Sequence, residues 1–130
     1  MNNIPQYLYH ATSSNVIKSI KKYGLGGKIP KQLWWDYKGT EYENRSQGVF
    51  LADDEYVAES FLDCSEEFAE FAEQYEERYD KELEIIVYQI DTNDLDISKL
   101  KIDTNNNVEE DFTYFYDGVI DYKLLKKVEL

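Results

Sequence analysis

The stretch Tyr7-Leu8-Tyr9-His10-Ala11-Thr12 decides how this chain of 130 residues is expected to begin its fold. Apolar and aromatic residues lead up to the single histidine of the sequence, which predicts a β-strand with His10 near its carboxyl end. A helix capped by Ser13 or Ser14 and closed by Gly24 is predicted to follow. Its apolar positions recur at helical spacing: Val16, Ile17 and Ile20. A polar side chain between a strand end and a capped helix often faces a pocket, so His10 is the first candidate functional residue.

Length and composition indicate one domain over residues 1–130, with an aromatic core supplied by 12 Tyr and 6 Phe. One His and one Cys argue against a zinc site of the usual ligands and exclude an internal disulfide. Cys64 falls between two amphipathic stretches and is expected to pack. No apolar run reaches the length of a membrane span, and the first residues lack the pattern of a signal peptide. We therefore expect a cytoplasmic protein without membrane contact.

The net charge of −13 is unevenly distributed, with +4 in residues 1–50 and −17 in residues 51–130. An acidic chain repels phosphate backbones, so nucleic-acid binding is disfavoured. The basic part contains His10 and the connection after it, where a small anionic ligand could be held. The alternative is that these charges only face solvent.

The remaining segments predict a mixed, mostly antiparallel α+β domain in which helices flank the strands. Strands are expected at 48–52, 84–90, 112–116 and 126–130, with 118–120 continuing the third. Asp53 or Asp54 caps one helix, and Ser65 opens a second whose outer face is acidic. Residues 91–100 are expected to form a turn with a short helix. The long connection over 26–47 carries Trp34 and Trp35, which either line a ligand or partner site or fix the loop to the core.

Two of these segments, with a third near the end, resemble the ADP-ribosyltransferase fold. Residues 9–12, followed by a helix and Gly24-Leu25, resemble its opening strand, which ends in Tyr-His-Gly-Thr or Tyr-His-Ala-Thr. Residues 48–53 are similar to the Gly-Ile-Tyr-Phe-Ala-Asp strand of poly(ADP-ribose) polymerases and to the corresponding strand of RNA 2′-phosphotransferases. Residues 111–120, followed by 124–130, resemble the closing strands of small bacterial and phage members. The resemblance implies split, mostly antiparallel sheets around a cleft for NAD.

The resemblance also implies roles for single residues toward NAD. His10 matches the histidine that hydrogen-bonds a ribose hydroxyl, with Thr12 supporting it, and the backbone of Ala11 matches the residue that pairs with the nicotinamide amide. The remaining expected NAD contacts are Arg45, near a phosphate, Phe50, in the second block, and Phe61, stacking on nicotinamide. Without the resemblance, His10 is a partly buried histidine with satisfied hydrogen bonds, and Phe61 is a core residue.

Active transferases of this fold place a glutamate at the start of a late strand, where it stabilises positive charge that develops on the ribose as nicotinamide leaves. Glu110 is nearest to that position. The alternative is a solvated charge at a loop edge.

Three functions remain open from the sequence. The first is an NAD-dependent mono-ADP-ribosyltransferase, a phage or bacterial effector that modifies a host protein. The second is an RNA 2′-phosphotransferase, which the overall charge and the presence of only Arg45 and Arg78 disfavour. The third is a catalytically silent member of the fold that acts as an acidic inhibitor or nucleic-acid mimic.

Overall fold

Six strands form one sheet of order β4-β5-β2-β1-β3-β6 in the computed structural model, which describes residues 4–27, 49–102 and 113–130. The strands are β1 Tyr7–Ser13, β2 Val49–Ala52, β3 Ile85–Asp91, β4 Leu100–Ile102, β5 Thr113–Tyr116 and β6 Lys126–Val128. The helices are α1 Ile17–Tyr23, α2 Glu55–Asp63 and α3 Glu66–Tyr79. Every strand pair is antiparallel, which confirms the expected α+β class.

The sheet is only weakly joined at its centre. β1 pairs with β3 along all seven of its residues, from Tyr7↔Asp91 to Ser13↔Ile85. β2 pairs with β5 along all four of its residues. Between β1 and β2, in contrast, the register of the described residues contains one pair, Tyr9↔Ala52. Two well-paired parts, β4-β5-β2 and β1-β3-β6, therefore meet at one point, which we call the split.

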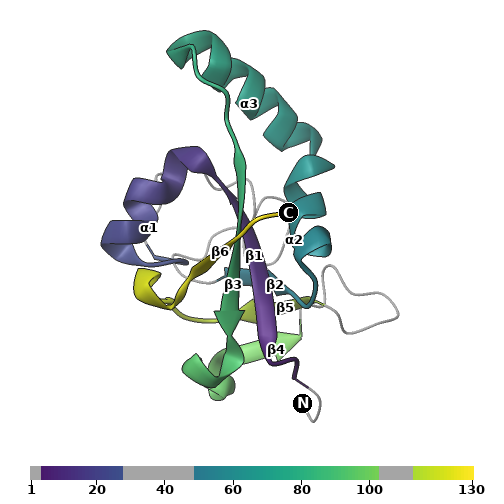
Figure 1. Cartoon of the computed structure of the whole chain (residues 1–130), viewed down its shortest axis with the longest axis vertical. Helices are drawn as coiled ribbons and strands as arrows, with labels where there is room; N and C mark the ends of the chain where they lie inside the picture. Colours follow the sequence, from purple (N-terminus) through teal and green to yellow (C-terminus); the bar gives the residue numbers. More distant parts are fainter. Residues whose placement is uncertain (1–3, 28–48, 103–112) are drawn as a thin grey trace.

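Helices α1 and α2 cover opposite faces of the sheet, as Figure 1 shows. Because strand side chains alternate, Leu8 and its neighbours two positions on lie on one face, where α1 contributes Val16 and Ile20 to the core. Ala11 lies on the other face, where it packs with Ala58 of α2. We call these the α1 face and the α2 face. Small side chains at Ala11, Ala52 and Ala58 let α2 lie close to the sheet.

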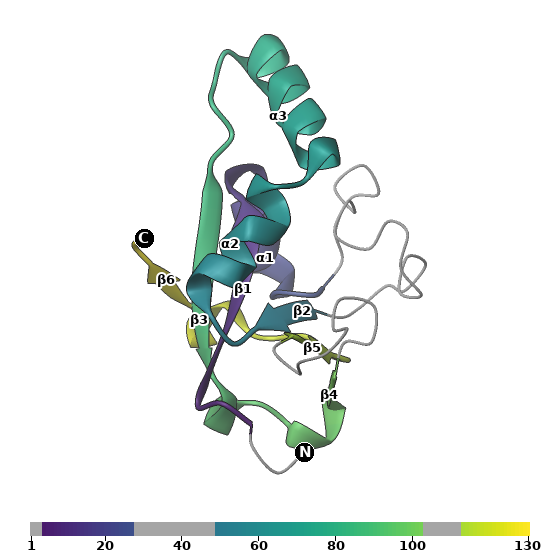
Figure 2. The ribbon, with the colours of Figure 1, turned by 90° about the vertical axis from the view of Figure 1, so that its right-hand side faces the viewer.

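The predicted caps of the second and third helices are confirmed. Asp54 caps α2, because its Oδ1 accepts hydrogen bonds from the N–H groups of Tyr56 at 2.8 Å and Val57 at 3.2 Å. Ser65 caps α3 by accepting from the N–H of Phe68 at 3.2 Å. α3 then rises beyond the end of the sheet, and residues 80–84 return beside it to β3 (Figure 2).

The predicted serine cap of the first helix is wrong. The Ser13 hydroxyl donates to the side chain of Asn15 and accepts from no helix N–H, and the Ser14 hydroxyl accepts from the N–H of Glu84 at 3.0 Å. A 3₁₀ turn over Ser14–Val16 precedes α1 instead. The serines fasten the end of β1 to the start of β3, because the N–H of Ser14 also donates to the Glu84 carbonyl at 2.8 Å.

Three further expectations also need correction. Residues 118–120 do not extend β5, because Ile120 forms an isolated bridge with Leu25 through hydrogen bonds of 2.7 and 2.9 Å. Strand β4, which pairs with β5, follows the expected turn region and was not predicted. Cys64 does not pack: it is a free, exposed thiol at the junction of α2 and α3. In the described ranges, no helix has the length and apolar composition needed to cross a bilayer.

Substitution of Phe115 in β5 tests the packing of the core. Its side chain is 0% exposed, so Phe115→Ala should lower the free energy of unfolding by about 3–5 kcal/mol through lost burial and a residual cavity. Tyr56→Ala, at a position 61% exposed, is the matched aromatic control and should change stability by less than about 0.5 kcal/mol. Urea denaturation measures both, and a loss below about 1 kcal/mol for Phe115→Ala would contradict the packing described.

Candidate functional site

His10 bridges the split between the two parts of the sheet. Its Nδ1 lies 2.7 Å from the carbonyl oxygen of Phe50 in β2. A carbonyl can only accept a hydrogen bond, so Nδ1 must carry the hydrogen and donate it. Nε2 of the neutral ring is then an acceptor with its lone pair unprotonated. The imidazole therefore both holds β1 to β2 and presents one acceptor atom.

Burial keeps this imidazole neutral. The side chain of His10 lies on the α1 face opposite Tyr88, its partner in β3, and His10 is 8% exposed. Loss of solvation lowers the pKa of His10 from 6.5 to about 4, against the smaller opposing effect of the hydrogen bond to Phe50. At neutral pH the ring is thus an uncharged donor and acceptor. Its burial matches the buried histidine that the sequence left open as an alternative, with a hydrogen bond at Nδ1.

Ala11 presents its backbone to the split. The N–H of Ser14 bonds to the Glu84 carbonyl, so even-numbered residues of β1 direct their backbone groups toward β3 and odd-numbered residues direct theirs toward β2. The pair Tyr9↔Ala52 would be followed by Ala11 opposite Phe50 if the ladder continued. The carbonyl of Phe50 is bonded to His10 instead. Ala11 itself has no ladder partner in β2 among the described residues.

Phe50 contributes to the split through two different groups. Its carbonyl receives the His10 hydrogen bond, while its ring packs against Phe115 with centroids 5.0 Å apart. Thr12, which was expected to support His10, is buried one position past Ala11 and pairs with Ile86 in β3. The structure therefore brings His10, Ala11, Thr12 and Phe50 together around the diverging ends of β1 and β2.

Phe61 does not join His10 in a common pocket. It lies on α2, which covers the α2 face, whereas the His10 side chain lies on the α1 face. The ring of Phe61 is 40% exposed and so is not an ordinary core residue. The two side chains are separated by the sheet, and a ligand that touches both must lie across the diverging ends of β1 and β2.

Four residues singled out in the sequence lie outside the described residues: Trp34, Trp35, Arg45 and Glu110. Their expected roles stay predictions. Among the residues with described positions, no three or more His, Cys, Asp or Glu side chains are grouped as a metal site would require.

Two features of this site could not be predicted from the sequence. The alternation of β1 gave a signal for the face on which His10 lies, but it could not indicate that the Phe50 carbonyl is its partner. That pairing joins residues 40 positions apart. Nor could the alternation indicate that Ala11, a buried residue, has no ladder partner in β2 among the described residues. Comparison with protein-family models, curated proteins and solved structures finds no significant match.

The lowered pKa of His10 predicts a pH-dependent stability. The unfolded chain binds a proton on this ring as the pH falls through 6.5, whereas the folded chain stays neutral until about pH 4. The free energy of unfolding should therefore fall by about 2 kcal/mol between pH 7 and pH 5, and it should be fully retained above pH 7. Urea titrations at each pH measure the change.

His10→Asn is the matched control, because the amide nitrogen of Asn can replace Nδ1 as donor to Phe50 and does not titrate. His10 is the single histidine of the chain, so the variant should lose most of the decline between pH 7 and pH 5. Parallel pH profiles for the two proteins would show that His10 is not the titrating group.

Proposed function

We propose that this chain is an NAD-dependent mono-ADP-ribosyltransferase, a phage or bacterial effector that modifies a protein of its host. The observation that carries the proposal is the convergence of the three family-like blocks. Residues 9–12, 48–53 and 111–120 contribute to β1, β2 and β5, which are neighbours in the order β5-β2-β1. The sheet splits between the first two, where His10, Ala11, Thr12 and Phe50 gather.

The backbone of Ala11 supports a role in binding nicotinamide. In a strand, the N–H and carbonyl groups of one residue face the same side and offer one donor and one acceptor. A primary carboxamide such as that of nicotinamide carries the complementary acceptor and donor. Since β2 does not pair with Ala11 within the described residues, these groups suit the ligand that the resemblance implies.

The tautomer of His10 supports a role in binding a ribose. With Nδ1 committed to Phe50, the remaining Nε2 can accept a hydrogen bond from a sugar hydroxyl. The lowered pKa keeps Nε2 unprotonated at neutral pH, so this acceptor is retained under physiological conditions. A dinucleotide is long enough to reach both His10 on the α1 face and the exposed ring of Phe61 on α2 across the diverging strand ends.

Glu110 is the proposed catalytic carboxylate. It precedes β5 by three residues in the sequence, and β5 is the neighbour of β2. NAD supplies a ribose with a cationic leaving group, and departure of nicotinamide leaves positive charge on the sugar. A carboxylate beside that sugar stabilises the charge without forming a bond to it. Arg45 would pair with a phosphate through its planar guanidinium.

Incubation with labelled NAD and a host-cell lysate tests the proposal. Wild type should label a discrete protein band, and Glu110→Gln should reduce labelling at least 100-fold while NAD binding persists. His10→Asn keeps the donor to Phe50 but removes the acceptor at the position of Nε2, so NAD binding should weaken about tenfold without loss of the fold. Isothermal titration calorimetry measures the binding.

Two substitutions on α2 provide a matched control. Phe61→Leu removes an exposed ring and should weaken NAD binding, whereas Tyr56→Leu removes another exposed ring on the same helix and should leave binding unchanged. Equal NAD affinity of wild type, His10→Asn and Phe61→Leu would contradict the site, and absence of any NAD binding would contradict the function.

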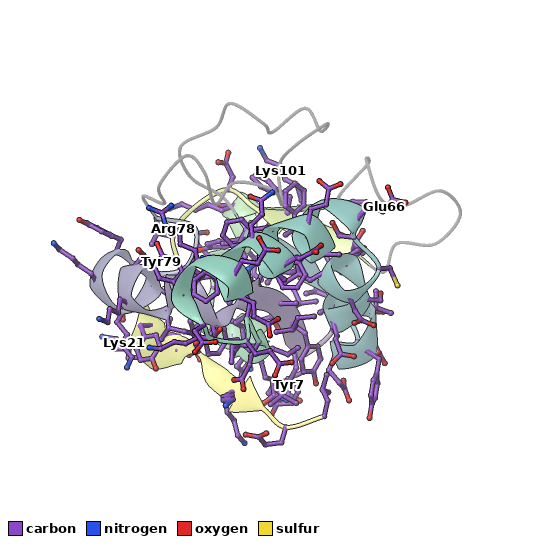
Figure 3. The ribbon with its side chains drawn as sticks, turned by 90° about the horizontal axis from the view of Figure 1, so that it is seen from above. Tyr7, Lys21, Glu66, Arg78, Tyr79 and Lys101 are labelled. Carbon is purple, nitrogen blue, oxygen red and sulfur yellow. The ribbon has the colours of Figure 1, made fainter. Side chains whose placement is uncertain are left out.

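A catalytically silent binding protein is the second candidate, and the surface of α3 favours it. Five carboxylates on this helix are exposed: Glu66, Glu70, Glu73, Glu76 and Glu77. Figure 3 looks down on the helix, which runs from Glu66 to Arg78 and Tyr79. A face of this charge suits a partner that ordinarily binds nucleic acid.

Charge reversal separates the two candidates. If α3 is the working surface, Glu66→Lys, Glu70→Lys and Glu73→Lys together should abolish inhibition of the host partner, while His10→Asn leaves it intact. If the protein is a transferase, the triple variant should keep the NAD affinity of wild type, and His10→Asn should weaken NAD binding about tenfold. Both proteins are compared by NAD titration and by growth of host cells that express them.

A further inference from the structure

A groove lies at the edge of the sheet, away from the split. It has a volume of about 550 Å³ and is bounded by the α2–α3 junction, by residues 82–87, and by β6 with the two residues after it. The apolar residues of its lining include Phe68, Leu83 and Val128. None of the residues aligned with NAD contacts lines it.

The strand that forms one wall of the groove has an incompletely paired edge. β3 pairs with β6 through Val87↔Val128, Tyr88↔Lys127 and Gln89↔Lys126. The next backbone group of β3 that faces this side belongs to Ile85, because Glu84 is bonded to Ser14 on the opposite side. β6 ends at Val128, and the described residues provide no backbone partner for Ile85 on the β6 side.

The charges around this edge are mostly of one sign. Five carboxylate side chains line the groove: Glu59, Asp63, Glu82, Glu84 and Glu129. Lys127 is the single basic residue in that lining, and it lies 3.8 Å from Glu129 in an exposed ion pair. An exposed pair of this kind contributes little energy. Because the carboxylates outnumber the single Lys, the electrostatic potential in the groove is negative beside the unpaired backbone of Ile85.

We infer that this groove binds an extended basic peptide segment of a partner protein by strand addition to β3. The peptide backbone pairs with the free backbone groups of Ile85 at the edge of β3, as edge strands do when they recruit another chain. Alternate side chains of the peptide point to opposite sides, so apolar residues reach Phe68 and Val128 while Lys or Arg side chains reach the carboxylates. This inference is independent of the proposed transferase activity.

Charge complementarity favours a basic peptide over a second copy of this chain. Each copy carries a net charge of −13, and pairing two such edges would bring the same carboxylates together. A basic peptide neutralises them instead. The affinity should therefore fall with rising salt concentration, because the contacts are exposed ion pairs.

A labelled eight-residue peptide that alternates Lys and Val tests the inference by fluorescence anisotropy. It should bind wild type at low salt at least tenfold more tightly than a peptide that alternates Gln and Val. The double variant Glu59→Lys, Asp63→Lys should weaken binding at least tenfold. The control variant Glu73→Lys, Glu77→Lys makes the same change in charge at the same i, i+4 spacing on α3, and it should weaken binding less than threefold.

Amide hydrogen exchange reports on the backbone contact. Saturation with the Lys-Val peptide should slow exchange of the Ile85 N–H at least tenfold, while a peptide N-methylated at alternate residues should bind weakly. Absence of binding, binding without protection of Ile85, or an equal loss in the α3 variant would overturn the inference. Self-association of the free chain with protection of Ile85, measured by analytical ultracentrifugation and exchange, would overturn it in favour of a second copy.

Discussion

The hydrogen bond from His10 Nδ1 to the carbonyl of Phe50 is the interaction on which the architecture of the site depends. Among the described residues the two parts of the sheet share one backbone pair, and the side chain of His10 supplies a second link between them. Ala11, the next residue of β1 whose backbone faces β2, has no ladder partner there within the described residues. One side-chain contact therefore joins β1 to β2 where the described ladder stops.

The protonation state of His10 follows from its burial. A charged imidazole in this environment would lose solvation, which is why its pKa falls to about 4. The neutral ring donates at Nδ1 and can accept at Nε2, whereas a charged ring could only donate. The proposed contact with a ribose hydroxyl thus depends on the same burial that ties the histidine to the core. The structural role of His10 and the role proposed for it toward a ribose are consequences of one arrangement.

Local patterns predicted much of the fold from the sequence. The aromatic alternation of β1 and the acidic and hydroxyl caps at Asp54 and Ser65 are signals carried by adjacent residues, and the structure contains all three. Features that depend on distant partners were not predictable in this way. β4 has three residues and is held by its pairing with β5, so its own sequence carries little signal.

The sequence predicted which residues lie near the candidate site better than it predicted how they are arranged. Alternation places Leu8, His10 and Thr12 on one face of β1, but it does not indicate which helix covers that face. The chain puts α1 there and α2 on the opposite face, which separates Phe61 from His10. Local sequence rules favour Ser13 or Ser14, at the end of β1, as the cap of the first helix. Glu84, just before β3, lies close enough for its N–H to bond the Ser14 hydroxyl instead. In each case a contact between distant segments determined the outcome.

The most direct test of this account is a long-range ¹H–¹⁵N NMR spectrum of the imidazole of His10, recorded at pH 7 and pH 5. We expect a protonated Nδ1 and an unprotonated Nε2 at both pH values, with the Nδ1 hydrogen protected from exchange by the Phe50 carbonyl. A ring protonated on Nε2 at pH 7, or on both nitrogens at pH 5, would contradict it.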